Sequence, residues 1–132
     1  LLWLLDKTKT CMGSRLMQST ILSPLVDRER IDYRLDGVEE FYNAPVVMLS
    51  VADLLSEVKD VERLSGKISN DNIMPRDCLA LASSLAVVPN IKFQLSGFMS
   101  KAVRDISDGL IDLSAVAELI GSAITDEDTP VN

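Results

Sequence analysis

The stretch DRERIDYRLDGVEEFY, residues 27–42, decides the fold class that this sequence predicts. Its large apolar side chains recur at steps of three and four residues, at Ile31, Leu35, Val38 and then Phe41 and Tyr42. That spacing places them on one face of an α-helix, whereas the apolar residues of a half-buried strand alternate with polar ones. Asp27 precedes the pattern, and its carboxylate suits the free N–H groups of a helix start. The stretch therefore predicts an amphipathic helix whose apolar stripe faces a core.

Similar patterns cover most of the remaining chain and predict further helices. They lie over residues 10–22 (with Thr10 as the cap), 46–58, 60–69, 75–88, 91–96, 99–107 and 114–124. Pro75 suits a first helical position, whereas Pro89 is expected to break or kink its helix because proline has no N–H group. Apolar residues expected to face inward include Leu16, Leu79, Ala82, Leu85, Ala86, Val116 and Leu119. The predicted fold is all-α, an irregular bundle of about seven helices joined by short loops.

The length, composition and charge of the chain limit the classes of protein to which it can belong. With 132 residues, 47% of them hydrophobic and 25% charged, the chain has the composition of one globular domain. The formal net charge is −7, but residues 1–34 hold six Lys and Arg against four Asp and Glu, and the remainder holds seven against 16. Because DNA binding needs clustered cations, this acidic body argues against strong nucleic-acid affinity in the chain itself.

The residue types available exclude most catalytic chemistry. The sequence has no histidine, which removes Ser-His-Asp and Cys-His sites and most zinc sites. Cys11 and Cys78 are the only cysteines, and Gly66-Lys67 lacks the Ser or Thr that completes a phosphate loop. We therefore expect no catalytic, cofactor-binding or metal-binding residues. The apolar runs fall far short of a membrane span, so a cytoplasmic protein without a membrane partner is expected.

Five short motifs run in order along the chain. They are LLDKTKTCMGSRL (residues 4–16), LSPL (22–25), IDYRLDGVE (31–39), DVERL (60–64) and PRDCL (75–79). They resemble the core domain of the MutS family of DNA mismatch-repair proteins, with its LLDxTxTPMGxRxL block, Pro-Leu turn, IxxRxDxV, DLER and PRDL motifs. Cys11 stands where that family has proline, and Ser19-Thr20 replace a basic-aromatic pair. The resemblance covers nearly the whole chain.

The resemblance implies a piece of a larger protein. MutS-like proteins bind mismatched duplex DNA as clamp-shaped dimers, and they combine a mismatch-reading domain, a connector, a helical core, a DNA clamp and an ATPase. Residues 1–132 are thus expected to be a core (domain III) fragment in which the mismatch-reading, clamp and ATPase domains are absent. ATP and Mg²⁺ would belong to the parent protein, as would mismatched DNA, a homodimeric partner and a MutL-type partner.

Two functions from different classes remain open. The favoured hypothesis is a fragment without chemistry of its own, whose helices couple the parent's ATPase to mismatched-DNA binding. Arg15, Asp60 and Arg63 are its candidate polar links, and the alternative for each is a surface ion pair contributing only ~0–1 kcal/mol. The second hypothesis is a free-standing helical adaptor that binds a partner protein through an apolar groove. Under the first, helices separated from their neighbours leave apolar surface exposed, so self-association or a loose terminus is expected.

Overall fold

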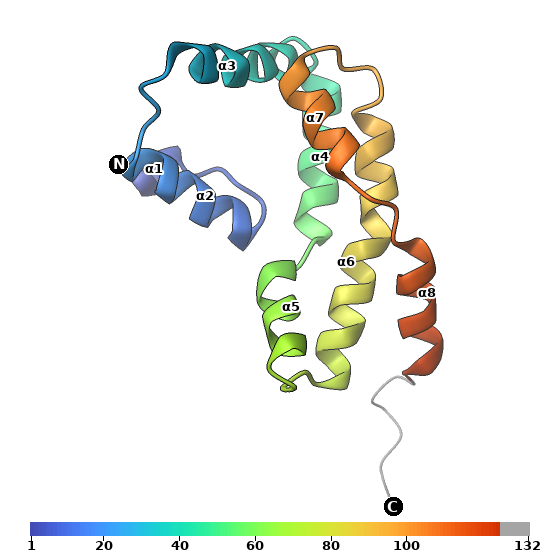
Figure 1. Cartoon of the computed structure of the whole chain (residues 1–132). Helices are drawn as coiled ribbons and strands as arrows, with labels where there is room; N and C mark the ends of the chain where they lie inside the picture. Colours follow the sequence, from blue (N-terminus) through green and yellow to red (C-terminus); the bar gives the residue numbers. More distant parts are fainter. Residues whose placement is uncertain (125–132) are drawn as a thin grey trace, which may run out of the picture.

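The computed structural model describes residues 1–124, and every regular element in that part of the chain is a helix (Figure 1). The helices are α1 (Leu2–Leu5), α2 (Cys11–Leu22), α3 (Arg28–Tyr42), α4 (Pro45–Glu57), α5 (Val61–Ser69), α6 (Pro75–Gln94), α7 (Lys101–Gly109) and α8 (Ser114–Ala123). The all-α class is confirmed. The predicted count of about seven is slightly off. The single turn α1 is too short to show a periodic pattern, and residues 91–94 of the predicted 91–96 helix continue α6.

Helix starts follow the predicted capping residues. The side chain of Thr10 accepts a hydrogen bond from the Gly13 N–H at 2.9 Å, and that of Asp27 accepts one from Arg30 N–H at 3.1 Å. Each bond satisfies a backbone donor that has no partner inside the helix. Pro75 occupies the first turn of α6, as its missing N–H predicts.

We expected Pro89 to break or kink its helix, and the break is wrong. Helix α6 runs through Pro89 to Gln94, so residues 91–96 do not form a separate helix. Proline removes one backbone hydrogen bond and crowds the carbonyl four residues earlier. Val87 and Ile91 flank Pro89 and are both buried in the core. Their burial keeps the two halves of the helix together at a position where local propensity alone favours a break.

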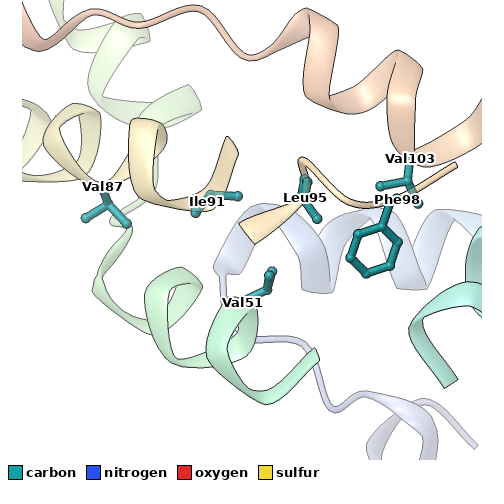
Figure 2. Close-up of a cluster of buried hydrophobic side chains, with 6 residues drawn as sticks. All are labelled: Val51, Val87, Ile91, Leu95, Phe98 and Val103. Carbon is teal, nitrogen blue, oxygen red and sulfur yellow. The ribbon is translucent and has the colours of Figure 1, made fainter. Parts of the chain in front are cut away.

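Helix α6 is the central helix of the fold and contacts three other helices. It packs against α4 and α8 along its length and against α5 near its start, while α3 lies across α7 at the other end (Figure 1). The core at the α4–α6–α7 junction consists of Val51, Val87, Ile91, Leu95, Phe98 and Val103 (Figure 2). The rings of Phe98 and Phe41 lie 4.6 Å apart between centroids, which ties α3 to this core.

The faces that the helices bury differ from several predicted ones. In α3 the predicted inward residues Leu35, Val38 and Tyr42 are 55%, 62% and 81% exposed. Leu16, Ala86, Val116 and Leu119 are also exposed, whereas Ala82 is buried as predicted. Small residues take the close contacts instead, namely Gly37 in α3, Ser84 in α6, Ala102 in α7 and Ala117 in α8. The helices of this fold contact one another where their side chains are short. The widest apolar stripes therefore remain exposed to solvent.

The contact between α3 and α7 combines this close approach with polar capping. A Cβ atom on Gly37 would lie 3.3 Å from Ala102 Cβ, so the glycine lets the two helices touch. The Glu40 carboxylate accepts hydrogen bonds from the backbone N–H groups of Met99 and Ser100, the latter at 2.9 Å. It therefore caps α7 from a neighbouring helix, and these bonds lower the pKa of Glu40.

A large apolar surface stays in contact with solvent. Leu22, Val26, Val46 and Phe93 are each at least 74% exposed. Within the described residues no helix is both long and apolar enough to cross a bilayer. Exposed apolar side chains of this size, such as those of Leu22, Val26, Val46 and Phe93, suit contacts with other protein surfaces.

Substitution of Gly37 tests the close approach of α3 and α7. Gly37→Leu is expected to lower the free energy of unfolding by about 1–3 kcal/mol, because the added side chain has no space at Ala102. The matched control is Gly66→Leu in α5, where an added Cβ meets nothing within 4 Å. That control is expected to be neutral or stabilising by up to about 1 kcal/mol, since leucine is the better helix former. Urea unfolding that ranks Gly37→Leu as stable as the control would contradict this packing.

Candidate functional site

The first motif of the sequence builds a helical hairpin from α1 and α2. Asp6 follows α1 and accepts hydrogen bonds from the Thr8 backbone N–H at 3.0 Å, the Thr8 hydroxyl at 2.6 Å and the Ser14 hydroxyl at 2.5 Å. These bonds favour the charged carboxylate and lower the pKa of Asp6. Thr10 then caps α2, so the motif residues Asp6, Thr8, Thr10 and Ser14 together set the turn between the two helices.

Gly13 and Cys11 have local explanations in this hairpin. A Cβ atom added to Gly13 would meet the side chains of Thr10 at 3.1 Å and Thr8 at 3.2 Å, both of which belong to the hairpin turn. The turn itself therefore leaves little room for a side chain at this position. Cys11 is the first residue of α2, a position whose N–H has no partner within the helix. This explains why proline, which the MutS pattern places there, also fits.

Arg15 carries the hairpin's contact with the rest of the fold. Its Nη1 donates to Asp60 Oδ2 at 2.7 Å, and its Nη2 donates to Asp60 Oδ1 at 2.9 Å and to Glu62 Oε2 at 2.6 Å. The guanidinium therefore grips the Asp60 carboxylate through two parallel bonds, the strong geometry for this pair. We call Arg15, Asp60 and Glu62 the Arg15 cluster.

Asp60 serves two structures at once. It caps α5 by accepting a hydrogen bond from Arg63 N–H at 3.2 Å, and it holds Arg15 of α2. Its side chain is only 16% exposed, compared with 42% for that of Arg15. The Arg15 guanidinium lowers the pKa of Asp60 to about 2, and the two carboxylates raise the pKa of Arg15. Asp60 therefore stays charged at any physiological pH.

Two further residues lie at this site. Arg63 interacts only weakly with Asp60, and Glu62 was not found by sequence analysis. The Arg63 side chain is 82% exposed and its Nε lies 4.0 Å from Asp60 Oδ2, so its guanidinium adds little to the cluster. Glu62 was not predicted as a site residue, although it lies within the quoted DVERL motif. Its partner is 47 residues away in the sequence, and no local spacing reveals such a contact.

The Arg15 cluster is an isolated link. Among the described residues, every hydrogen bond between the α1–α2 hairpin and the later helices comes from Arg15. Figure 1 shows the hairpin lying apart from the α4–α6–α8 stack and joined to it by the segment that leads into α3. The arrangement has no activated nucleophile or proton donor. It is suited to holding two helical bodies in one relative position.

Side chains that could bind a metal ion are not gathered into a site in the described part of the chain. Within residues 1–124 no group of three or more His, Cys, Asp or Glu side chains is placed to hold a metal ion. Cys11 and Cys78 are free thiols, the first exposed and the second half-buried.

Comparison with known proteins assigns the family. The family model described as MutS domain III matches residues 1–132. The chain belongs to the MutS family. It is 43% identical over its full length to the DNA mismatch repair protein MutS of Caldicellulosiruptor bescii. It is 38% identical to the Clostridium perfringens protein of that name, with 96% of this chain covered, and 42% identical to the Methanosarcina mazei protein, with 93% covered.

The match to MutS proteins is confined to a small part of each. The chain spans 15% of the Caldicellulosiruptor protein and 14% of the Clostridium and Methanosarcina proteins. The similarity is therefore to domain III of these proteins, and it does not extend to the activity of a whole MutS protein.

Removing the guanidinium tests the geometry of the cluster. In Arg15→Ala the pKa of Asp60 is expected to rise from about 2 toward its ordinary value of 3.8, because its main stabilising partner is lost. Arg63→Ala is the control, and it should leave the pKa low because the Arg63 backbone N–H remains. The Asp60 carboxyl ¹³C shift, followed by NMR against pH, measures both. Equal titration of Asp60 in the parent and Arg15→Ala proteins would contradict the bidentate contact.

Proposed function

We propose that this chain is the domain III portion of a mismatch-repair MutS protein and serves as its force-transmitting element. It performs no covalent chemistry in this role. Its helices relay movement between an ATPase and the parts that hold mismatched DNA, both lying elsewhere in the parent protein. ATP and Mg²⁺ are bound by those other parts. Membership of the family and the small share of each relative that the chain matches support this proposal.

The observation that carries the proposal is the Arg15 cluster. Close-packed helices move as rigid bodies between discrete positions, and they transmit a displacement only if the bodies are joined. Here the α1–α2 hairpin and the helices around α6 are joined by the 23–27 linker and by the contacts of Arg15. An ion pair that is partly open to water contributes little net free energy, so a modest force on either body can open it. Through such a link, a displacement of the α1–α2 hairpin can change the position of the helices around α6, and the reverse.

The surface supports the same role. An element held between other domains presents apolar side chains to them on several sides, and exposed apolar residues occur here on α1, α2, α3 and α4. For the alternative, a free-standing adaptor, a match limited to a small interval of longer relatives is unexpected. Mismatched DNA, a second MutS protomer and a MutL-type protein are therefore proposed as partners of the parent protein.

A chimaera tests coupling directly. Residues 1–132 replace the matching interval of the Caldicellulosiruptor MutS protein, and Arg15→Ala is introduced into that chimaera. ATP turnover in the variant is expected to lose most of its response to mismatched DNA, while turnover without DNA stays the same. Arg76→Ala, an exposed arginine of α6, is the control and should retain the response. A normal response in Arg15→Ala would remove the Arg15 cluster from the transmission path.

DNA titration separates direct from indirect involvement. The 132-residue chain by itself is expected to bind a labelled duplex weakly or not at all, with no preference for a mismatch, because of its net charge of −7. Fluorescence anisotropy at low and physiological salt measures this. Tight, mismatch-dependent binding would show that the domain reads DNA itself and would contradict a purely mechanical role.

A further inference from the structure

The linker between α4 and α5, residues 58–60, is bonded to the central helix through a buried serine. Figure 1 shows this linker beside the middle of α6. The Lys59 backbone N–H donates a hydrogen bond to Ser84 Oγ at 2.9 Å, and the Ser84 hydroxyl donates to the Ala80 carbonyl of its own helix at 2.8 Å. Within residues 1–124, the bond from Lys59 is the one hydrogen bond that joins the linker to α6. The position of the linker on α6 therefore depends on Ser84.

Helix formation alone does not explain a serine at this position. Ser84 lies inside a long helix and is fully buried, although serine is a poorer helix former than alanine. A buried hydroxyl is also costly unless hydrogen bonds satisfy it. Alanine has nearly the same volume and would favour the helix more. What serine adds here is the acceptor for the Lys59 N–H.

The same linker holds the carboxylate that binds the α1–α2 hairpin. Asp60 directly follows Lys59, and Arg15 of α2 grips its side chain. The Lys59 carbonyl accepts a hydrogen bond from the Val61 N–H at 2.8 Å, which closes a tight turn around Asp60. This turn restricts the backbone between the two contacts. The contact with α6 and the contact with the hairpin therefore cannot move independently.

A second polar contact between α5 and α6 lies far from Asp60. Lys67, in the last turn of α5, donates to Asp77 in the first turn of α6 at 2.8 Å. It is separated from Asp60 by about two helical turns. This pair anchors the end of α5, whereas Ser84 anchors the linker at its start. The position of Asp60 thus depends on Ser84 more than on the Lys67 pair.

We propose that Ser84 is a positioning residue for the Arg15 cluster. By fixing the 58–60 linker on α6, it holds the Asp60 carboxylate where the Arg15 guanidinium binds it. A displacement of the hairpin then reaches the central helix through Arg15, Asp60 and Ser84, and a displacement of α6 reaches the hairpin by the same route. This inference extends the proposed force-transmitting function and rests on it.

NMR on the full 132-residue chain tests the route in both directions. In Ser84→Ala the pKa of Asp60 is expected to rise from about 2 partway toward 3.8, because the linker loses its anchor and the carboxylate moves away from the guanidinium. In Arg15→Ala the Lys59 amide is expected to exchange with solvent at least about threefold faster, because its bond to Ser84 opens more often. Two coupled sites must affect each other reciprocally.

The pKa of Asp60 separates positioning from a purely structural role. Ser84 is uncharged and makes no hydrogen bond to Asp60, so its removal changes that pKa only by moving the groups that act on the carboxylate. Those groups are Arg15, Arg63 and Glu62, and Ser84→Ala keeps all three. A purely structural serine would speed exchange of the Lys59 amide in Ser84→Ala and leave the pKa of Asp60 unchanged.

Ser83→Ala is the matched control. Ser83 is exposed, and its hydroxyl donates only to the same Ala80 carbonyl, at 3.0 Å. Its removal should change neither the pKa of Asp60 nor the exchange of the Lys59 amide. Ser84→Cys keeps the volume and a weak sulfur acceptor, so it should raise the pKa by a smaller amount. It replaces Ser84→Ala if circular dichroism shows that Ser84→Ala unfolds.

Three results would each overturn the proposal. They are an unchanged pKa of Asp60 in the Ser84 variants, unchanged exchange of the Lys59 amide in Arg15→Ala, and an equal pKa rise in Ser83→Ala. None of them decides the force-transmitting function, because that function is tested by the ATPase response of the Arg15→Ala chimaera.

Discussion

The bidentate contact between Arg15 and Asp60 sets how the two parts of this fold lie relative to each other. The α1–α2 hairpin has its own internal bonds, and the later helices share a core around Val51, Val87 and Ile91. Between these bodies, the hydrogen bonds within residues 1–124 all come from Arg15. Asp60 adds to this role by capping α5, so displacement of Arg15 also disturbs the start of the next helix. The link therefore joins tertiary position to local helix stability.

The remaining helices are arranged so that contacts between them use short side chains. Gly37 admits α7, and Ser84 is fully buried in α6, where its hydroxyl accepts a hydrogen bond from the Lys59 backbone N–H. Large apolar side chains are left outside on α3 and α4. In a protein that works alone this surface would be a liability, but in a domain held among others it supplies interfaces. Under the proposed function, other parts of the parent protein would cover this surface.

The sequence predicted local features well and long-range ones poorly. Helix boundaries followed from Thr10, Asp27 and Pro75, because capping depends on residues within one turn. The inward faces of α3 and α8 were mispredicted, since periodicity locates an apolar stripe without showing what covers it. Arg15 and Asp60 were named as candidates, but their direct contact and the part played by Glu62 depend on residues more than 40 positions apart, which only the fold brings together.

The central claim is that the Arg15 cluster holds the α1–α2 hairpin in place, and a distance measurement between spin labels tests it most directly. Labels at Ser19→Cys in α2 and Ser65→Cys in α5, with Cys11 and Cys78 replaced by serine, report the separation of the two bodies. We predict a narrow distance distribution that broadens markedly when Arg15→Ala is added. Distributions of equal width with and without the guanidinium would contradict the account.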